Sequence, residues 1–408
     1  MGIREDALKL HRDNQGKLAV ASKVPLTSRE DLSLAYTPGV AEPCKDIKAN
    51  SDLSFELTCR GNMVAVVSDG TRVLGLGDIG PEAAMPVMEG KSVLFKVFGD
   101  VDAVPICLGT KDPEKIIETV KLLEPTFAGI NLEDLSSPKC YDIEDRLKEI
   151  MDIPVFHDDQ HGTAIAALAG VVGALRFVKK DLATAKFVVN GAGAAGTAIG
   201  RLLVYAGAKN VVMVDVNGAL YDGMPGLNRV QQKLAESTNK EKVKGNLSDM
   251  AKGADVLIGV SAPGAFTSEI IQSMNKDAVV FGMANPVPEA TYADAKAAGA
   301  RVAGTGRSDA PNQVNNVTVF PGLFRGAMDV RARQINEEMK LAAVYAIADL
   351  IPVDQMRDDY VVADAFDARV APAVAAAVAK AAMETGVARI QVDPEEIRAK
   401  TYARVGRK

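Results

Sequence analysis

The chain has no tryptophan, and only three histidines and four cysteines occur among its 408 residues. The cysteines stand far apart in the chain, at Cys44, Cys59, Cys107 and Cys140. This spacing contains no CxxC pair, which argues against both a cysteine zinc site and a disulfide framework. We therefore expect four buried, reduced thiols with a structural role.

The few histidines limit metal chemistry in the same way. His157 and His161 have the i, i+4 spacing of a zinc-binding pair, but zinc needs at least a third nitrogen or sulfur ligand. The remaining histidine, His11, lies far away in a charged N-terminal stretch that is predicted to be helical. The sequence therefore disfavours a zinc site.

Long apolar runs and blocks of one charge are also missing. The longest uncharged apolar stretch, residues 162–175, is too short to span a bilayer, and the N-terminus carries charges where an export signal would be apolar. The net charge is −6, with acids and bases interspersed, which argues against nucleic acid or an anionic membrane as a partner. We expect a cytoplasmic protein that acts on a small molecule.

What the chain does contain is a complete dinucleotide-binding pattern. An apolar run over residues 186–190 leads into a GxGxxG turn formed by Gly191, Gly193 and Gly196. Helix formers follow, and a second apolar run ends at Asp215, which is placed to accept hydrogen bonds from a ribose diol. Such glycines alone often mark only a tight loop, but the strand, helix and terminal acid around them favour binding of a dinucleotide pyrophosphate.

The first half of the chain alternates between apolar runs and helical stretches, which indicates βαβ units. Residues 63–68 and 71–74 are predicted strands. Asp69 and Gly70 between them are a strong two-residue hairpin signal, because both turn positions need positive φ. Arg72 would then lie on the second strand of the hairpin.

Paired acids follow two consecutive predicted strands of this half. Glu133 and Asp134 follow the first strand, and Asp158 and Asp159 follow the second. Because ligands bind at the carboxyl ends of parallel strands, four carboxylates would converge there, which favours a divalent cation such as Mg²⁺ or Mn²⁺. Asp158 or Asp159 could instead cap the helix predicted over residues 162–177.

The predicted fold is α/β. We expect an N-terminal α/β domain over residues 1–160 that binds substrate and metal, and a Rossmann-type domain over residues 161–330. Residues 331–408 should form C-terminal helices that pack back on the first domain. The site should lie in the cleft between the two domains.

Seven segments, taken in order, resemble malic enzymes: residues 36–40, 75–80, 90–91, 131–134, 156–164, 283–286 and 315–322. The resemblance covers roughly residues 33–327 and is closest to the short bacterial form. It implies oxidative decarboxylation of L-malate to pyruvate and CO₂, with reduction of NAD(P)⁺ and a divalent metal ion. It also implies a homodimer.

The resemblance further implies a role for individual residues. Glu133, Asp134 and Asp159 match the family's metal ligands, with Asp158 beside them. Lys91, on a helix predicted over residues 84–98 and interrupted near Gly90, matches the general base, its pKa lowered by the nearby cation. The remaining matches are Tyr36 as the acid that protonates C3, Arg72 as the carboxylate-binding arginine, and Asn285 and Asn316 as substrate and nicotinamide contacts.

Several alternatives remain open at this point. Lys91, Tyr36 and Arg72 could be ordinary surface or half-buried side chains, and either asparagine could serve only a turn. Asp215 favours NAD because it would repel a 2′-phosphate, although NADP-using members can carry an acid there as well. A malolactic-type enzyme, a dehydrogenase that stops at the keto acid, and a catalytically silent nucleotide sensor are the rival functions.

Overall fold

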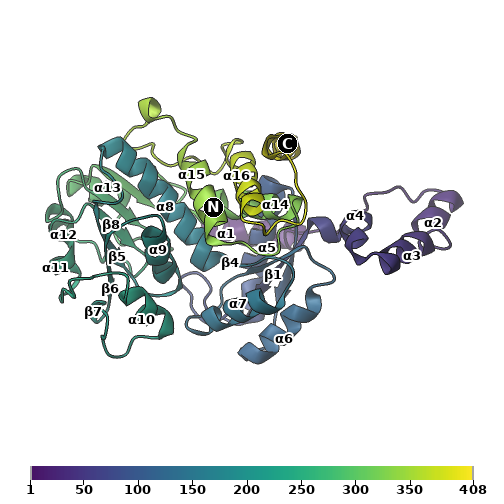
Figure 1. Ribbon diagram of the computed structural model, residues 1–408, viewed down its shortest axis with the longest axis horizontal. Coiled ribbons are helices and arrows are strands. Elements are labelled where there is room, and N and C mark those ends of the chain that lie inside the picture. The colour runs from purple at the N-terminus through teal and green to yellow at the C-terminus, as the bar shows by residue number, and fades with distance from the viewer. Residues whose placement is uncertain (1, 407–408) are drawn as a thin grey trace.

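The computed structural model describes residues 2–406 and contains two largely parallel sheets with helices packed around them (Figure 1). The first sheet has the strand order β2-β1-β3-β4. Its strands are β1 (Met63–Ser68), β2 (Asp102–Cys107), β3 (Gly129–Leu132) and β4 (Val155–His157). All three pairings are parallel, as the βαβ pattern predicts.

The predicted hairpin is not formed. β1 pairs with β2 on one side and with β3 on the other, so neither edge is free for a hairpin partner. Residues 71–80 form a loop instead, with one isolated bridge between Val73 and Gly77. Arg72 therefore lies on a loop, where its backbone N–H donates to the carbonyl of Asp134 at 3.0 Å. This bond holds the loop against the carboxyl end of β3.

Three long helices connect these strands: α5 (Pro81–Gly99), α6 (Pro113–Leu123) and α7 (Lys139–Ile150). Asp112 caps α6, accepting a hydrogen bond from the N–H of Glu114. α5 runs through Gly90 without the predicted interruption. One interior glycine costs a helix only about 1 kcal/mol, and burial of Met88 and Phe95 on the same helix outweighs that cost.

The second sheet is a Rossmann-type sheet with the order β10-β9-β8-β5-β6-β7, in which only the short edge strand β7 is antiparallel. Its strands are β5 (Lys186–Asn190), β6 (Asn210–Asp215), β7 (Gly218–Ala219), β8 (Val256–Gly259), β9 (Val279–Gly282) and β10 (Val302–Thr305). The helices of this half are α9 (Ala194–Tyr205), α10 (Arg229–Ala235), α11 (Leu247–Ala251), α12 (Ser268–Gln272) and α13 (Tyr292–Ala297). The α/β prediction, with a dinucleotide-type second half, is confirmed.

Helix α8 (Asp158–Val178) connects the two sheets and is the central helix of the molecule. By length and composition it is the one helix of residues 2–406 that could cross a membrane, but 78% of its apolar window is buried inside the protein, as in a core helix. It begins earlier than predicted. His157 occupies the N-cap, so Asp158 and Asp159 lie in the first turn, and the alternative that one of them caps this helix is wrong.

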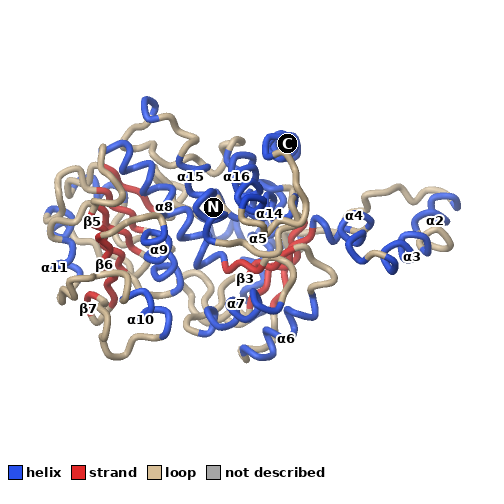
Figure 2. The backbone as a smooth tube through the Cα atoms, viewed as in Figure 1, coloured by secondary structure: helices blue, strands red, loops and turns tan. Residues whose placement is uncertain are grey.

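The C-terminal helices are α14 (Phe320–Asp329), α15 (Glu337–Ala348), α16 (Val370–Glu384) and α17 (Pro394–Val405). α14 and α17 pack on α5, and α15 packs on α8, so the C-terminal part returns to the first sheet as predicted (Figure 2). α16 consists largely of alanine and valine, and these small side chains let it pack closely against α14 and α15.

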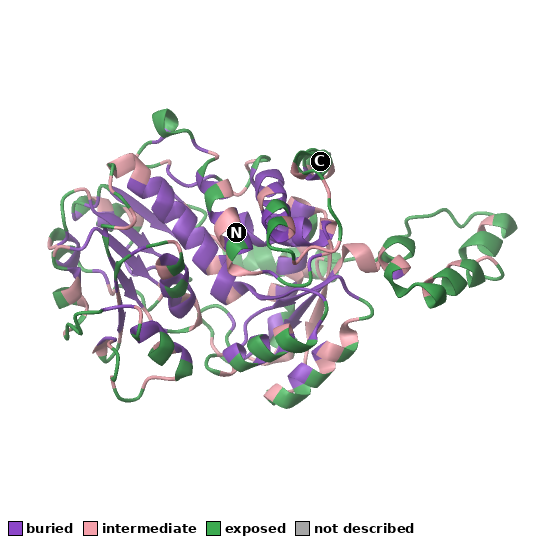
Figure 3. Cartoon of the chain, viewed as in Figure 1, coloured by how far each residue is buried: buried purple, intermediate pink, exposed green. Residues whose placement is uncertain are grey.

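The N-terminal elements lie at the surface. They are α1 (Ile3–Asn14), α2 (Arg29–Ala35), α3 (Ala41–Ala49) and α4 (Ser54–Leu57). α2 and α3 project from the rest of the chain, and their residues are almost all exposed (Figure 3). The expectation of four buried thiols is therefore wrong: Cys140 is buried, but Cys44 on α3 and Cys59 are exposed, and all four are unpaired.

Candidate active site

Charged side chains meet at the carboxyl ends of β3 and β4. Glu133 and Asp134 come directly after β3, and Asp158 and Asp159 begin α8 directly after β4. The parallel pairing of the two strands brings these ends side by side. Lys91 approaches from α5, which packs along β1. The structure thus gathers the predicted base and the predicted metal ligands into one buried cluster.

Lys91 is the centre of this cluster. Its Nζ lies 2.5 Å from Asp158 Oδ2 and 2.9 Å from Glu133 Oε1, and 4.3 Å above the ring of Phe320. Its side chain is only 7% exposed. Burial alone lowers the pKa of Lys91, but the carboxylates of Asp158 and Glu133 outweigh burial and raise the pKa.

The carboxyl groups of the cluster lie in an environment that disfavours their charged forms. Burial and the neighbouring charges of Asp159 and Glu133 raise the pKa of Asp134 to about 9. Burial is also the main reason that the pKa values of Asp158 and Asp159 rise to about 6. Asp134 Oδ2 and Asp158 Oδ1 are buried without a hydrogen-bond partner. Such oxygens are suited to a bound divalent cation, which would offset the repulsion.

The cluster is not preformed as a metal cage. Within residues 2–406, no three His, Cys, Asp or Glu side chains are gathered closely enough to hold a metal ion as they stand. Glu133 faces Lys91, and Asp159 Oδ2 accepts the backbone N–H of Asp134 at 2.7 Å. The donors are the hard oxygens that Mg²⁺ and Mn²⁺ prefer, so the residues present fit such an ion once their carboxylates turn toward it.

Of the predicted substrate contacts, Asn316 reaches the cluster. Its Nδ2 donates to Asp158 Oδ2 at 2.5 Å. Arg72 is exposed, and its guanidinium donates to the carbonyl of Leu74 at 2.8 Å. The hydrogen bond from its backbone N–H to the carbonyl of Asp134 holds the residue at the edge of the cluster. Asn285 is also exposed, on the loop after β9.

Tyr36 is the one predicted site residue that the structure places elsewhere. It follows α2 on the projecting N-terminal segment, and 67% of the residue is exposed. Figure 1 shows α2 and α3 well apart from α5 and β4. The other predicted catalytic residue, Lys91, has no tyrosine from this segment beside it in the same chain.

The dinucleotide turn has the expected backbone. Gly191 adopts φ +112°, and its N–H donates to the carbonyl of Val214. A Cβ on Gly196 would lie 1.7 Å from the carbonyl oxygen of Gly191, whereas a Cβ on Gly193 would meet nothing within 4 Å. Asp215 ends β6, and its Oδ1 accepts the N–H of Asn217 at 2.7 Å. Gly193 thus leaves room for a pyrophosphate at the start of α9.

The sequence analysis missed Glu289, which is fully buried beside this turn. Glu289 Oε1 accepts the N–H of Ser261 at 2.6 Å and its Oγ–H at 3.0 Å, while Oε2 accepts the N–H of Ala284 at 2.9 Å. It ties together the loops after β8 and β9, the second of which carries Asn285. No local pattern marks this role, because Glu289 lies on the loop after β9 and its partner Ser261 comes from the loop after β8.

The hydrogen-bond partners of His161 were also not predicted from the sequence. His161 Nε2 lies 3.0 Å from Glu144 Oε2, and its Nδ1 lies 3.0 Å from Lys340 Nζ. Glu144 also accepts from Gln160 and from the N–H of His157, and pairs with Lys148 at 2.6 Å. His161 therefore belongs to a buried polar network behind β4.

We expect Glu144→Ala to destabilise the fold, because it removes the acceptor shared by these buried donors. Losing one partner of a buried charge network costs about 3–5 kcal/mol. Urea denaturation would measure this loss. Glu149→Ala, at an exposed position of the same helix, should stay within about 0.5 kcal/mol of the unsubstituted chain. Equal stability of the two variants would contradict the structural role of Glu144.

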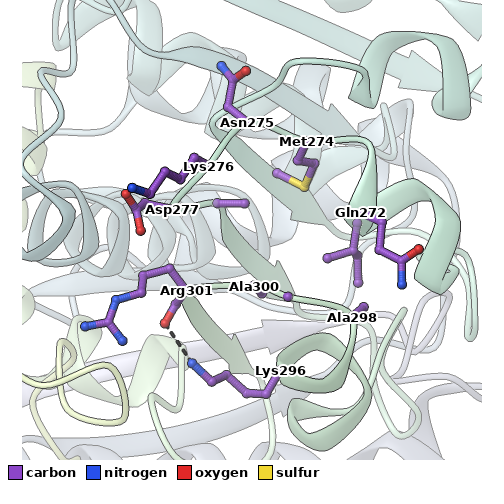
Figure 4. Close-up of a pocket in the computed structure, with 12 residues that line it drawn as sticks. Gln272, Met274, Asn275, Lys276, Asp277, Lys296, Ala298, Ala300 and Arg301 are labelled. Carbon is purple, nitrogen blue, oxygen red and sulfur yellow. Dashed lines mark hydrogen bonds between the residues drawn. The ribbon is translucent and has the colours of Figure 1, made fainter.

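A hollow on the surface of the second half of the chain lies away from this site. It has a volume of about 430 Å³ and lies at the amino ends of β9 and β10, lined by residues such as Met274, Lys276 and Arg301. Figure 4 shows these side chains, with Lys296 donating to the carbonyl of Arg301 at 2.8 Å. Parallel α/β sheets bind ligands at the opposite, carboxyl edge.

Comparison with known proteins agrees with this geometry. Residues 15–112 and 109–148 match the malic enzyme N-terminal domain, and residues 160–383 match the malic enzyme NAD-binding domain. The bifunctional malic/malolactic enzyme of Bacillus subtilis is 61% identical over 402 residues, covering 98% of both chains. The NAD-dependent malic enzyme of Geobacillus stearothermophilus is 54% identical over 92% of this chain and 78% of its own.

A solved structure gives the same result at the level of the whole fold. The malic enzyme of Pyrococcus horikoshii superposes with a TM-score of 0.95 at 48% identity, over 99% of this chain and 96% of its own. Two domain models that together match most of the chain, and relatives of this identity and coverage, establish its ancestry. The chain belongs to the malic enzyme family.

Proposed function

We propose that this protein oxidises and decarboxylates L-malate to pyruvate and CO₂, with reduction of NAD⁺. The observation that carries the proposal is Lys91, buried between Glu133 and Asp158 at the carboxyl ends of two parallel strands. A buried amine at such a position can act as a general base that removes a hydroxyl proton. The family membership and the dinucleotide turn supply the rest of the argument.

The proposed roles follow the chemistry of each residue. A cation bound among the acids would lower the pKa of Lys91 and favour its free-amine form. In that form Lys91 takes the proton of the C2 hydroxyl while the C2 hydrogen leaves as hydride to NAD⁺. The resulting keto acid loses its C4 carboxylate as CO₂, and Tyr36 gives a proton to C3 of the enolate that remains. Glu133, Asp134 and Asp159 would hold a Mg²⁺ or Mn²⁺ ion, which would supply Lewis-acid stabilisation of developing negative charge.

Substrate and cofactor binding is assigned to residues at the edge of the carboxylate cluster and in the dinucleotide turn. Arg72 presents a planar fork suited to a substrate carboxylate. Asn285 and Asn316 are proposed to contact substrate and nicotinamide from the loops after β9 and before α14. Gly191, Gly193 and Gly196 accommodate the pyrophosphate, and Asp215 accepts hydrogen bonds from the adenosine ribose, which favours NAD over NADP.

We also propose the domain division 1–160, 161–330 and 331–408, and a homodimer. The two family models meet between residues 148 and 160, which supports the first boundary. The apolar side chains exposed on the N-terminal segment support an association between chains. The exposed, unpaired Cys44 and Cys59 suit a reducing compartment, and so a cytoplasmic location.

The first experiment follows absorbance at 340 nm with purified protein, L-malate and Mn²⁺, using NAD⁺ and NADP⁺ in parallel. We expect reduction of NAD⁺ with one pyruvate formed per NADH. EDTA should abolish the reaction and excess Mn²⁺ should restore it, because the carboxylate cluster is then again neutralised. Lactate is measured in the same samples, because the Bacillus subtilis relative is named for malolactic activity as well.

The outcomes separate the rival functions. Lactate without NADH would support a malolactic enzyme, and NADH with stable oxaloacetate would support a simple dehydrogenase. Reduction that is unaffected by EDTA would contradict the proposed metal site. Absence of turnover with either nucleotide would contradict the proposed function altogether.

A further inference from the structure

Glu289 is a fully buried acid on the loop after β9, and none of the roles proposed above makes use of it. Its carboxylate accepts three hydrogen bonds from two loops. Oε1 accepts the N–H of Ser261 at 2.6 Å and the hydroxyl of the same residue at 3.0 Å, and Oε2 accepts the N–H of Ala284 at 2.9 Å. These three residues, hereafter the Glu289 clamp, hold the loops after β8 and β9 at a fixed separation.

Ser261 connects the Glu289 clamp to the dinucleotide turn. Its Oγ accepts a hydrogen bond from Nδ2 of Asn190, the last residue of β5, at 2.8 Å. The neighbouring Val260 donates its N–H to the carbonyl of Asn190 at 2.9 Å, and its own carbonyl oxygen would lie 2.5 Å from a Cβ on Gly191. β5 and β8 are neighbours in the second sheet (Figure 1). The loop after β8 is therefore fixed against the turn that is proposed to receive the pyrophosphate.

Ala284 connects the Glu289 clamp to the substrate side of the site. It directly precedes Asn285, the proposed contact to substrate and nicotinamide, and Glu289 holds its N–H. The carbonyl oxygen of Asn285 would lie 2.8 Å from a Cβ on Gly75, which belongs to the loop that carries Arg72. Through Glu289, the loop after β9 is thus joined to the dinucleotide turn on one side, and it contacts the Arg72 loop on the other.

The strand order predicts where the nicotinamide half of a bound dinucleotide lies. β5 has β6 on one side, and β8 followed by β9 on the other. With the adenosine ribose at Asp215, which ends β6, and the pyrophosphate at Gly193 after β5, the rest of the cofactor extends over β8 and β9. The loops after these two strands are the ones that Glu289 joins.

We infer that Glu289 is a positioning residue for hydride transfer, because it holds the two loops on which the nicotinamide ring lies. The hydride carries two electrons from C2 of malate, which is oxidised, to C4 of the nicotinamide, which is reduced. Reacting atoms have to lie about 3–3.5 Å apart, and a misplacement of about 1 Å lowers the rate by about 10²-fold. A clamp that fixes both loops also fixes this distance. This role rests on the proposed function.

The task of joining both loops needs a carboxylate of this length. A carboxylate offers two oxygens that act only as acceptors, which suits three donors that come from different loops. Gly259 leaves space for this group, because a Cβ there would lie 2.5 Å from Cδ of Glu289. In Glu289→Gln, the NH₂ group would face either the N–H of Ala284 or the two donors of Ser261. One loop would therefore be released while the shape of the side chain is kept.

The test compares Glu289→Gln with the unsubstituted protein in two measurements. Single-turnover formation of NADH, with protein in excess over malate and with saturating NAD⁺ and Mn²⁺, reports the hydride-transfer step. The affinity for ADP-ribose, which has the adenosine and the pyrophosphate but no nicotinamide, reports the dinucleotide turn alone. We expect the single-turnover rate to fall by about 10²-fold. The affinity for ADP-ribose should not change, because Gly193 and Asp215 keep their places.

Two further variants make the comparison specific to the Glu289 clamp. Glu269→Gln changes an exposed acid of α12 in the same half of the chain, and it should keep the single-turnover rate. Ser261→Ala removes the hydroxyl between Glu289 and Asn190 but keeps the N–H bond to Glu289, so its rate should fall less than that of Glu289→Gln. If Glu289→Gln does not fold, Ser261→Ala replaces it. A lower rate with unchanged ADP-ribose affinity then supports the positioning role, and an unchanged rate overturns it.

The outcomes separate the positioning role from the proposed function. Equal single-turnover rates of the Glu289→Gln and unsubstituted proteins would overturn the positioning role, even if the variant melts at a lower temperature. Loss of ADP-ribose binding together with the rate would show that Glu289 supports the whole dinucleotide-binding half, and would also overturn it. If the unsubstituted protein forms no NADH from malate, the proposed function fails, and the role in hydride transfer fails with it.

Discussion

Lys91→Met is expected to reduce malate oxidation by about 10²–10⁴-fold, the usual contribution of a positioned proton-transfer group. The substitution keeps the length of the side chain and its packing against Phe320, but it removes the amine that lies 2.5 Å from Asp158 and 2.9 Å from Glu133. No other predicted site residue stands between these two acids. Turnover number and KM for malate, measured at saturating Mn²⁺ and NAD⁺, would show the effect, which should fall on turnover.

Two controls keep this result from being read as misfolding. Lys96→Met lies on the same helix, at an exposed position where Lys96 pairs with Asp100 and Asp102, and it should keep nearly full activity. Lys91→Met removes a positive charge from among four acids, so Mn²⁺ binding measured by calorimetry should be kept or strengthened. An active Lys91→Met enzyme, or equal losses in the two variants, would rule out Lys91 as the base.

The convergence of the four acids is the part of the site that could be predicted from the strand pattern of the sequence, whereas Lys91 is indicated only by the family resemblance. Strand ends of a parallel sheet share one edge, so acids after β3 and β4 must meet there once the βαβ pattern is recognised. The same rule predicts where Asn285 lies, on the loop after β9. These predictions succeed because each needs only the strand boundaries and the direction of pairing.

The failures come from contacts that local sequence does not encode. Asp69 and Gly70 are good hairpin residues, yet β1 has β2 and β3 on its two edges, so tertiary pairing overrides the turn signal. Cys44 was expected to be buried, but α3 has no buried residue in a single chain. The segment that carries Cys44 and Tyr36 projects from the rest of the chain, and nothing in its local sequence predicts that its two helices bury no residue.

Substitutions in the dinucleotide turn should give the second large effect, on stability and on NAD⁺ binding. Two of its glycines have different roles, one in packing and one in leaving room for the nucleotide. Gly196→Ala should destabilise the protein, since its Cβ would lie 1.7 Å from the carbonyl oxygen of Gly191, and a backbone oxygen cannot rotate away as a side chain could. This steric clash can be relieved only if α9 moves away from the turn. Overpacking of this kind costs about 1–3 kcal/mol and sometimes more. We expect a lower melting temperature together with loss of NAD⁺ binding.

Gly193→Ala separates nucleotide binding from stability. A Cβ at this position meets nothing within 4 Å, and its backbone, with φ −82°, suits any residue, so the melting temperature should not change. The added methyl group would stand in the space left for the pyrophosphate and should raise the KM for NAD⁺ while leaving Mn²⁺ binding intact. If Gly193→Ala binds NAD⁺ normally, the pyrophosphate does not lie at this turn. If Gly193→Ala unfolds the protein, Gly193 has a packing role. For the other glycine, a stable Gly196→Ala variant that binds NAD⁺ would show that α9 can shift without cost.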